Sequence, residues 1–333
     1  MQALNVGVIG CGGFARGIHI PNMINNPKFN LYAVADINET AARDTANDAH
    51  IERWTTNPDQ LLSDKAVDAV LIATRHDFHA ELSVKSAEAG KHVICEKPMG
   101  MNRDECKAVA EAVKRKNVKY TVGYNRGMAP LVVRARELLE STHGKKLIYH
   151  RIQAPFPEDD WTHNPLIGGG RFIGEGCHIF DLLCELAQAP PVSVYASGGT
   201  FLNPENVKIP DSGIVTIGFA DGSVGTTLIA SAGCAEFPKE ATEIYCNNKA
   251  IYIDNFIKLS YFGFEKEPGN VELSAVDKGL AVELDKFADA VLNDTESPNG
   301  PVKAARAAVI SYAVNESIAS GKPIPVCEAD YTF

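Results

Sequence analysis

No apolar run in the sequence approaches about 18 residues, the length that a membrane-spanning helix needs. The opening stretch MQALNVGVIG also lacks the basic segment, apolar core and small-residue cleavage site of a secretory signal peptide. These absences argue against a membrane span and against export. We therefore expect a soluble, cytoplasmic protein with no membrane partner.

Positive charge is scarce as well. The 32 Lys and Arg residues are outnumbered by 42 Asp and Glu residues, which gives a formal net charge of -10. A chain with this balance repels the phosphate backbone of a nucleic acid on average. The composition therefore disfavours nucleic-acid binding and favours a small-molecule partner.

The eight cysteines include no C-x-x-C pair, and a chain of 333 residues is too long to need disulfides for its stability. We expect reduced thiols. Cys177 and His178 are neighbours, but no second pair completes the spacing of a tetrahedral zinc site. We predict no metal.

What the chain does contain is two successive patterns, which suits a length beyond that of most single cores. Over residues 1–123, short apolar runs alternate with helical stretches. The runs are NVGVIG, LYAVAD, VDAVLIAT, KHVICE and KYTVGY, and the helical stretches include ETAARDTANDA, HAELSVKSAEAG and DECKAVAEAVKRK. Apolar runs with little polar alternation indicate strands that are buried on both faces. We predict an α/β domain whose parallel sheet is wrapped by helices.

Residues 124–333 follow a different pattern and predict a second domain of the α+β class. Most of its segments look like strands joined by turns, which indicates a large, mostly antiparallel open sheet. The strand-like segments are KKLIYHRIQA, PVSVYASGGTF, SGIVTIGFA, SVGTTLIAS, TEIYCNN and KAIYIDN. Helical periodicity returns in GLAVELDKFADAVLND and in PVKAARAAVISYAVNESIAS.

A glycine-rich loop, GCGGFA, follows the first strand-like run. Gly10 permits the tight turn, Gly12 lets the backbone approach a pyrophosphate, and Ala15 allows a helix to pack closely on the strand. The other members of the loop, Cys11, Gly13 and Phe14, are expected to contact the same ligand. Strand, loop and helix in this order identify the first domain as a Rossmann dinucleotide-binding domain.

Asp36 ends the second run, where its carboxylate can accept hydrogen bonds from an adenosine ribose. The neighbouring Ile37 and Asn38 are uncharged, so no adjacent cation would neutralise a 2′-phosphate. The sequence therefore favours NAD over NADP.

Further candidates follow the later strand-like runs, at the carboxyl edge of the sheet where doubly wound folds bind ligands. Thr74 and His79 are expected on the cofactor side, although His79 could equally be a helix-start histidine without a ligand. Glu96 and Lys97 follow the run VIC, and Pro98 fixes the backbone after them. A cation at Lys97 can polarise a hydroxyl or carbonyl oxygen near a nicotinamide.

The segments GVIGCGGFA, AVAD, VLIAT, CEKP, VGYNR and GGGRFIGEGCHIFD occur in the order of the glucose-fructose oxidoreductase and inositol dehydrogenase family, Gfo/Idh/MocA, which the chain resembles over nearly its whole length. The resemblance implies an NAD-dependent dehydrogenase of a sugar, sugar derivative or cyclitol. It implies that Lys97 contacts the substrate hydroxyl and that His178 is the general acid/base. Lys97 also counts among the cofactor contacts, and we expect it to share a cleft with His178.

One position departs from the family pattern. Many members carry an aspartate four residues before the histidine, where this chain has Gly174, and an acid follows one step later at Glu175. Asp181 could orient the imidazole instead. Further candidates for the substrate pocket are Asn125, Arg126, Trp161, His163, Arg171 and Glu175; for Trp161, a core or interface role is equally open.

Two other functions stay open from the sequence. One is an NAD-dependent glycosidase that oxidises its sugar only transiently, and the other is a non-catalytic NAD-binding regulator. The broad sheet of the second domain has one face that needs a cover, which predicts a homodimer or homotetramer.

Overall fold

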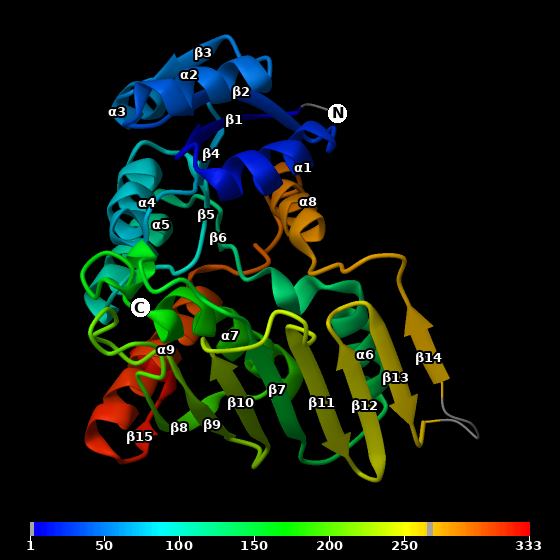
Figure 1. Cartoon of the computed structure of the whole chain (residues 1–333). Helices are drawn as coiled ribbons and strands as arrows, with labels where there is room; N and C mark the ends of the chain where they lie inside the picture. The colour runs from blue at the N-terminus through cyan, green and yellow to red at the C-terminus, as the bar shows by residue number, and fades with distance from the viewer. Residues whose placement is uncertain (1–2, 265–268) are drawn as a thin grey trace. The chain divides into compact units, whose positions relative to one another are not determined.

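The computed structural model describes residues 3–264 and 269–333 (Figure 1). The chain forms two compact units. The first consists of Met1–Gly123, Leu280–Ala305 and Phe333, and the second of Tyr124–Gly279 and Arg306–Thr332. The sequence pattern predicts residues 280–305 as part of the second domain, and the structure corrects this prediction because the segment packs with the first unit.

The first unit is built on a six-stranded sheet in the order β3-β2-β1-β4-β5-β6. All of its neighbouring strands are parallel. The strands are β1 (Leu4–Ile9), β2 (Phe29–Ala35), β3 (Arg53–Thr55), β4 (Ala69–Ile72), β5 (His92–Cys95) and β6 (Tyr120–Val122). This is the Rossmann strand order, with its switch point between β1 and β4. Of these strands, the sequence runs miss only the three-residue β3.

Asparagines start several of the helices that connect these strands. The side chains of Asn38, Asn57 and Asn102 each accept a backbone N–H of the first turn, so they satisfy donors that have no partner within the helix. The helices of this unit are α1 (Ile20–Ile24), α2 (Glu39–Asp48), α3 (Pro58–Ser63), α4 (His79–Glu88), α5 (Arg103–Lys116) and α8 (Leu280–Leu292).

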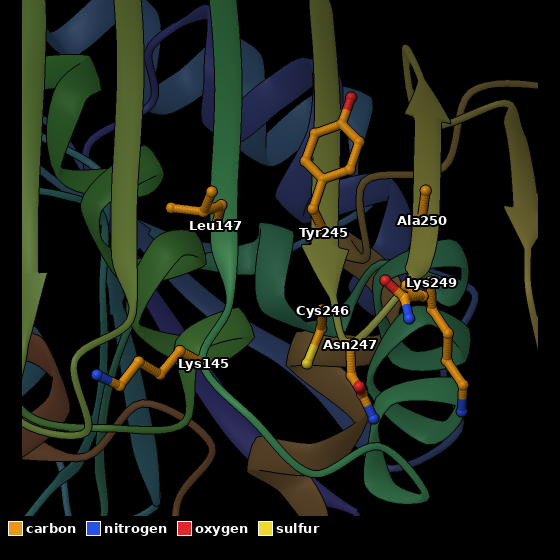
Figure 2. Close-up of a pocket in the computed structure, with 8 residues that line it drawn as sticks. Lys145, Leu147, Tyr245, Cys246, Asn247, Lys249 and Ala250 are labelled. Atoms are coloured by element: carbon orange, nitrogen blue, oxygen red, sulfur yellow. The ribbon is translucent and has the colours of Figure 1, made fainter.

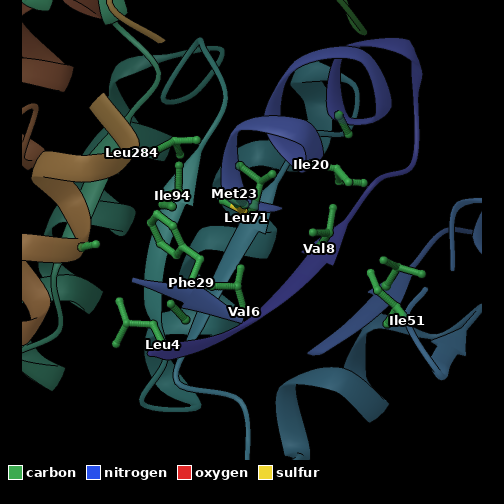
Figure 3. Packing of buried hydrophobic residues seen from close by; sticks show 14 of the residues in the cluster. Leu4, Val6, Val8, Ile20, Met23, Phe29, Ile51, Leu71, Ile94 and Leu284 are labelled. Carbon is green, nitrogen blue, oxygen red and sulfur yellow. The ribbon is translucent and has the colours of Figure 1, made fainter. Parts of the chain in front are cut away.

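Helix α8 belongs to this unit because its apolar face completes the core. Leu284 and Phe287 are buried in one cluster with Val6, Val8 and Phe29 (Figure 3). A buried phenylalanine or leucine contributes roughly 1.5–3 kcal/mol of transfer free energy. Helical periodicity predicts this helix, but the period alone does not say which sheet the apolar face will cover.

The second unit is built on a nine-stranded sheet in the order β14-β13-β12-β11-β7-β10-β9-β8-β15. All neighbours are antiparallel except β7 and β10. The strands are β7 (Leu147–Gln153), β8 (Pro191–Gly199), β9 (Ser212–Phe219), β10 (Val224–Ala230), β11 (Glu240–Cys246), β12 (Lys249–Asp254), β13 (Lys258–Phe262), β14 (Gly269–Glu272) and β15 (Ile324–Pro325). The predicted fold class is thus confirmed for both sheets. The sequence runs do not include β13 or the two edge strands β14 and β15.

One face of this sheet is covered by helices of its own unit. Helix α7 (Cys177–Ala187) packs on β7 and β10, and α6 (Pro130–Glu140) packs on β12 and β13. Helix α9 (Pro301–Ser320) begins in the first unit and continues into the second. On the other face, side chains that pair across six strands stand outward: Tyr195, Thr216, Thr226, Tyr149, Glu243 and Tyr252. Over the described part of the chain, no helix combines the length and apolar character that crossing a bilayer requires.

Candidate functional site

Three neighbouring strands of the first unit end at one edge of its sheet, and each is followed by a predicted site residue. Strand β1 leads into the loop that starts at Gly10, β4 leads to Thr74, and β5 leads to Glu96 and Lys97. Because parallel strands share their carboxyl edge, these segments lie side by side within the unit. The structure therefore brings together the segments that the sequence predicts to bind the ligand.

The glycine loop has the geometry of a dinucleotide loop. Gly10 has φ +98°, and a Cβ there would lie 2.5 Å from the carbonyl oxygen of Ala73. At Gly12 and Gly13, an added Cβ would meet nothing within 4 Å. The backbone at these two positions is therefore open to a close-packed phosphate, while Gly10 is fixed by the turn.

Asp36 ties this loop to the end of the second strand. Its Oδ2 accepts the backbone N–H of Cys11 at 2.7 Å, and its Oδ1 accepts that of Asn38 at 2.8 Å. Each carboxylate oxygen has a second lone pair, so these bonds leave acceptor capacity for a ribose hydroxyl. The Cys11 thiol is buried, and burial raises its pKa to about 11, so the backbone of Cys11 is the part suited to a ligand.

A π-helical turn, Ala15–His19, follows the loop. It carries His19 inward, where Nε2 lies 2.6 Å from Oε1 of Glu96. The other oxygen of Glu96 accepts the backbone N–H of Lys97 at 3.2 Å. Burial opposes the charge of Glu96, but the hydrogen bond from His19 and the charges of His19 and Lys97 lower its pKa overall. Glu96 thereby joins the glycine loop to the backbone at Lys97.

The two predicted contacts after β4 differ in exposure. Thr74 is half-buried, and its hydroxyl donates to the carbonyl of Arg75 at 3.2 Å. His79 has no exposed surface: Nδ1 lies 2.9 Å from the carbonyl oxygen of Pro98, and Nε2 lies 3.1 Å from that of Thr74. This corrects the expectation for His79, because a side chain with no exposed surface cannot contact a cofactor without local rearrangement. It bridges two loops of the edge instead.

In the second unit, a second π-helical turn, Phe172–Gly176, runs into α7. His178 is the second residue of α7, is buried, and lies edge-on to the ring of Tyr124 with a centroid distance of 6.0 Å. Turns of this type are rare and occur frequently at functional sites. The segment that carries Gly174, Glu175 and His178 is thus helical throughout.

The glycines before this turn allow a close approach between segments. A Cβ at Gly168 would lie 2.1 Å from Cα of Thr162, and Gly170 has φ +83°. The segment that follows carries Arg171, whose guanidinium lies 4.4 Å from the ring centre of Phe156. Trp161 is 40% exposed, whereas His163 is buried, with Nε2 3.0 Å from the carbonyl oxygen of Pro157.

A buried charge network surrounds Arg126. Its Nε and Nη2 donate to Glu240 at 2.7 and 3.1 Å, and Nη2 also donates to Glu175 at 3.0 Å. Lys278 donates to Glu240 at 2.5 Å, and Nε2 of His150 lies 3.6 Å from it. Burial opposes the charge of Glu240, yet Arg126, His150 and Lys278 hold its pKa well below the usual range. Any contact of Arg126 with a substrate must compete with these two carboxylates.

Two other predicted residues have protein partners in the same unit. The amide nitrogen of Asn125 donates to the carbonyl of Lys278 at 2.7 Å. Asp181 is fully buried, and its Oδ1 lies 3.6 Å from Nη2 of Arg306. The predicted role of Asp181 in orienting the imidazole of His178 stays a prediction.

Sequence reasoning missed His19, Tyr124, His150, Glu240 and Lys278. Tyr124 belongs to the motif VGYNR, so the motif could have drawn attention to it. Glu240 and Lys278 lie in no motif, and only the fold brings them to Arg126. Among the described residues, no three His, Cys, Asp or Glu side chains gather as potential metal ligands.

A pocket of about 410 Å³ lies elsewhere on the second unit. Figure 2 shows Lys145, Leu147, Tyr245 and Lys249 around it, at the end of β11 where Cys246 turns into Asn247. The charge network meets the opposite end of this strand, at Glu240, roughly 20 Å away at about 3.4 Å per residue. The pocket is therefore separate from the site around Arg126.

Comparison with known proteins identifies the family. Residues 4–124 match the family described as "Oxidoreductase family, NAD-binding Rossmann fold", and residues 133–252 match the "GFO/IDH/MocA C-terminal domain". The chain belongs to the Gfo/Idh/MocA oxidoreductase family.

Relatives within this Gfo/Idh/MocA family cover most of the chain. A myo-inositol 2-dehydrogenase of Thermotoga maritima is 28% identical over 256 residues, 76% of this chain and 75% of its own. A levoglucosan dehydrogenase of Pseudarthrobacter phenanthrenivorans is 30% identical over 262 residues, 68% of this chain and 67% of its own. A solved levoglucosan dehydrogenase in complex with NADH shares the fold, with a TM-score of 0.88 at 23% identity over 98% of this chain and 100% of that one.

The first unit of this family member is thus an NAD-binding Rossmann domain, and NAD is the cofactor. The residues present fit that group. The backbone at Gly12 and Gly13 is open to a phosphate, and Asp36 is fixed where a ribose hydroxyl is read in such folds. The preference for NAD over NADP stays a prediction.

Proposed function

We propose that this protein is an NAD-dependent dehydrogenase that oxidises a ring CH–OH group of a sugar, sugar derivative or cyclitol. The observation that carries the proposal is Lys97, which follows the strand β5 at the same sheet edge as the dinucleotide loop. Relatives named myo-inositol 2-dehydrogenase and levoglucosan dehydrogenase support the substrate class.

The chemistry divides between the cofactor and the chain. Bound NAD would be the acceptor of the hydride that leaves the substrate carbon. The imidazole of His178 takes the hydroxyl proton as that hydride leaves, so the alcohol becomes a carbonyl. The ammonium group of Lys97 stabilises the negative charge that develops on the oxygen. The proposal requires both side chains at one substrate.

Absorbance at 340 nm tests this function directly. We would incubate the purified chain and NAD with a panel of sugars, cyclitols and glycosides, and record NADH formation. Production of NADH with at least one free sugar or cyclitol is the expected result. A glycoside that is consumed without NADH accumulation would replace the dehydrogenase with the redox-neutral glycosidase. Binding of NAD without any reaction would favour the non-catalytic regulator.

We also propose that two copies pack through the exposed face of the nine-stranded sheet, in a homodimer or within a homotetramer. Several large apolar side chains on that sheet are exposed, among them Leu147 at 61% and Ile214 at 51%. Light scattering at micromolar concentration should give at least twice the monomer mass, and Ile214→Glu should lower it. A monomeric mass for the unmodified chain contradicts this assembly.

A further inference from the structure

Arg171 is a buried cation to which the protein supplies no anion. Only 6% of the residue is exposed. Within residues 3–264 and 269–333, its Nε has no hydrogen-bond partner and its guanidinium has no carboxylate within ion-pair distance. The guanidinium instead lies over the ring face of Phe156. Burial lowers the pKa of this guanidinium, which shows that the surroundings oppose its charge.

The neighbouring charges have an excess of cations. Arg126 is satisfied by Glu240 and Glu175, whereas Lys239 reaches Glu175 only at 4.0 Å. Burial lowers the pKa of Lys239 as well. The nearby Asp160 uses Oδ1 to accept both the N–H and the hydroxyl of Thr162. Among the described residues, Arg171 thus has no carboxylate partner, and Lys239 has only Glu175, at the limit of ion-pair distance.

We propose that the substrate of this enzyme carries an anionic group, a carboxylate or a phosphate ester, which Arg171 binds with help from Lys239. A guanidinium presents two parallel N–H donors that match either group, and it is the cation that proteins use for buried pairs of this kind. The inference rests on the proposed function for the sugar part of the ligand. It narrows the substrate class from neutral sugars and cyclitols to sugar acids and sugar phosphates.

The placement of Arg171 suits this role. It precedes His178 by seven residues along the π-helical turn and the start of α7, on the order of 10 Å at about 1.5 Å per residue. A long arginine side chain can span part of that distance, so one monosaccharide can meet both residues. The anionic group would then lie at a ring position remote from the carbon that is oxidised.

Calorimetric titration of the NAD-loaded full chain tests the proposal without requiring turnover. The probes are D-glucuronate, D-glucose 6-phosphate and D-glucose, which share one ring and differ at C6. The variants are Arg171→Met, which keeps most of the volume, and Arg171→Lys, which keeps the charge. Arg151→Met is the matched control, because Arg151 also stacks on an aromatic ring, 4.3 Å from the centre of Phe237.

We expect at least one anionic probe to bind about tenfold more tightly than glucose, which corresponds to one ion pair of about 1.4 kcal/mol. Arg171→Met should abolish that difference, Arg171→Lys should restore part of it, and Arg151→Met should leave it unchanged. The stronger of the two anionic probes identifies carboxylate or phosphate as the source. Equal or weaker binding of both anionic probes, or an unchanged difference in Arg171→Met, overturns the proposal.

Thermal unfolding supplies a second readout that separates a binding role from a packing role. If Arg171 serves a ligand, Arg171→Met should keep or raise the melting temperature of the ligand-free chain, because it removes a buried charge that has no carboxylate partner. A marked fall would assign Arg171 to packing on Phe156. The outcome is distinct from that of the proposed function: neutral sugars could be oxidised without any anion preference, and anions could bind at Arg171 without NADH formation.

Discussion

Each unit of the molecule buries a glutamate beside basic residues, and the two glutamates differ in their partners. Glu96 in the first unit has one side-chain partner, the imidazole of His19, and one backbone partner beside it in the chain, the N–H of Lys97. Glu240 in the second unit has Arg126, Lys278 and the more distant His150. The carboxylate of Glu96 holds the backbone at Lys97 next to His19. The carboxylate of Glu240 binds cations that come from separate parts of the chain.

The two glutamates differ in how their surroundings would respond to a change of charge. A buried carboxylate with one neutralisable partner can adjust when that partner changes its charge. A carboxylate that faces two permanent cations cannot be removed without leaving them uncompensated. We therefore expect the first unit to tolerate changes around its glutamate better than the second does.

The largest expected effect concerns His178 and Lys97, the two residues to which the proposed function gives chemical roles. His178→Ala should lower kcat by about 10²- to 10⁴-fold, because a positioned acid/base contributes that much to proton transfer. Lys97→Ala should lower kcat and also weaken substrate binding. Neither should change NAD affinity much, since the Gly10 loop and Asp36 are untouched. Steady-state kinetics on a verified substrate measure this, and retention of half the kcat in both variants would remove the pair from the mechanism.

The second-largest effect is expected for Glu240→Gln. This variant should lose roughly 3–5 kcal/mol in the free energy of unfolding, because Arg126 and Lys278 would stay buried without their anion. Urea denaturation measures the loss. Glu243→Gln is the matched control: this residue lies on the same strand, on the opposite face of the sheet, and should change stability by no more than about 0.5 kcal/mol. Equal effects of the two variants would mean that the network adds nothing specific.

Glu96→Gln should cost about 1.5–3 kcal/mol at pH 7, the usual worth of a hydrogen bond to a charged group. The folded-state pKa values of both glutamates are lowered, so both stabilise above the unfolded value of about 4.3 and lose this contribution as pH falls through the folded value. The gap between wild type and Glu96→Gln should close at a higher pH than the gap for Glu240→Gln, because Glu240 is shifted further. Urea unfolding from pH 7 to pH 3 checks the order, and the reverse order would contradict the comparison.

The smallest expected effect concerns the first unit only, namely its preference for NAD(H) over NADP(H). Wild type should bind NAD(H) at least about tenfold more tightly than NADP(H), because Asp36 would face the added phosphate. Asp36→Ala should shrink this preference, and Asp36→Asn, which keeps an acceptor oxygen, tests whether the charge is responsible. Fluorescence titration with both cofactors decides it. Equal affinities in the wild type would refute the expected selectivity.

The same contrast explains how far the sequence could be interpreted. The glycine loop, Asp36 and Lys97 were predictable because their chemistry depends on residues that are adjacent in the chain. Glu240 was not, since it pairs with Arg126 across 114 residues and with Lys278 across 38. In the sequence, Glu240 is only one more polar residue ahead of the strand-like run TEIYCNN.

Segment 280–305 shows a second limit. Its helical period was plain, but Leu284 and Phe287 could cover any apolar sheet of suitable size. The helical period shows which face of the helix is buried, but it does not show which sheet that face packs on. Likewise, His79 stood at the start of a helix in the sequence, and nothing local indicated that Thr74 and Pro98 would enclose it.

The return of α8 to the first unit has a consequence for how the protein is made. The six strands of the first sheet are all synthesised by residue 122, yet the helix that covers their apolar side begins only at Leu280. At about 5–20 residues per second, a ribosome needs roughly 10 to 30 s to add the residues between them. During that interval part of the apolar surface of the nascent sheet lacks its cover, and we expect this unit to need chaperones more than a Rossmann domain formed by one continuous stretch of chain.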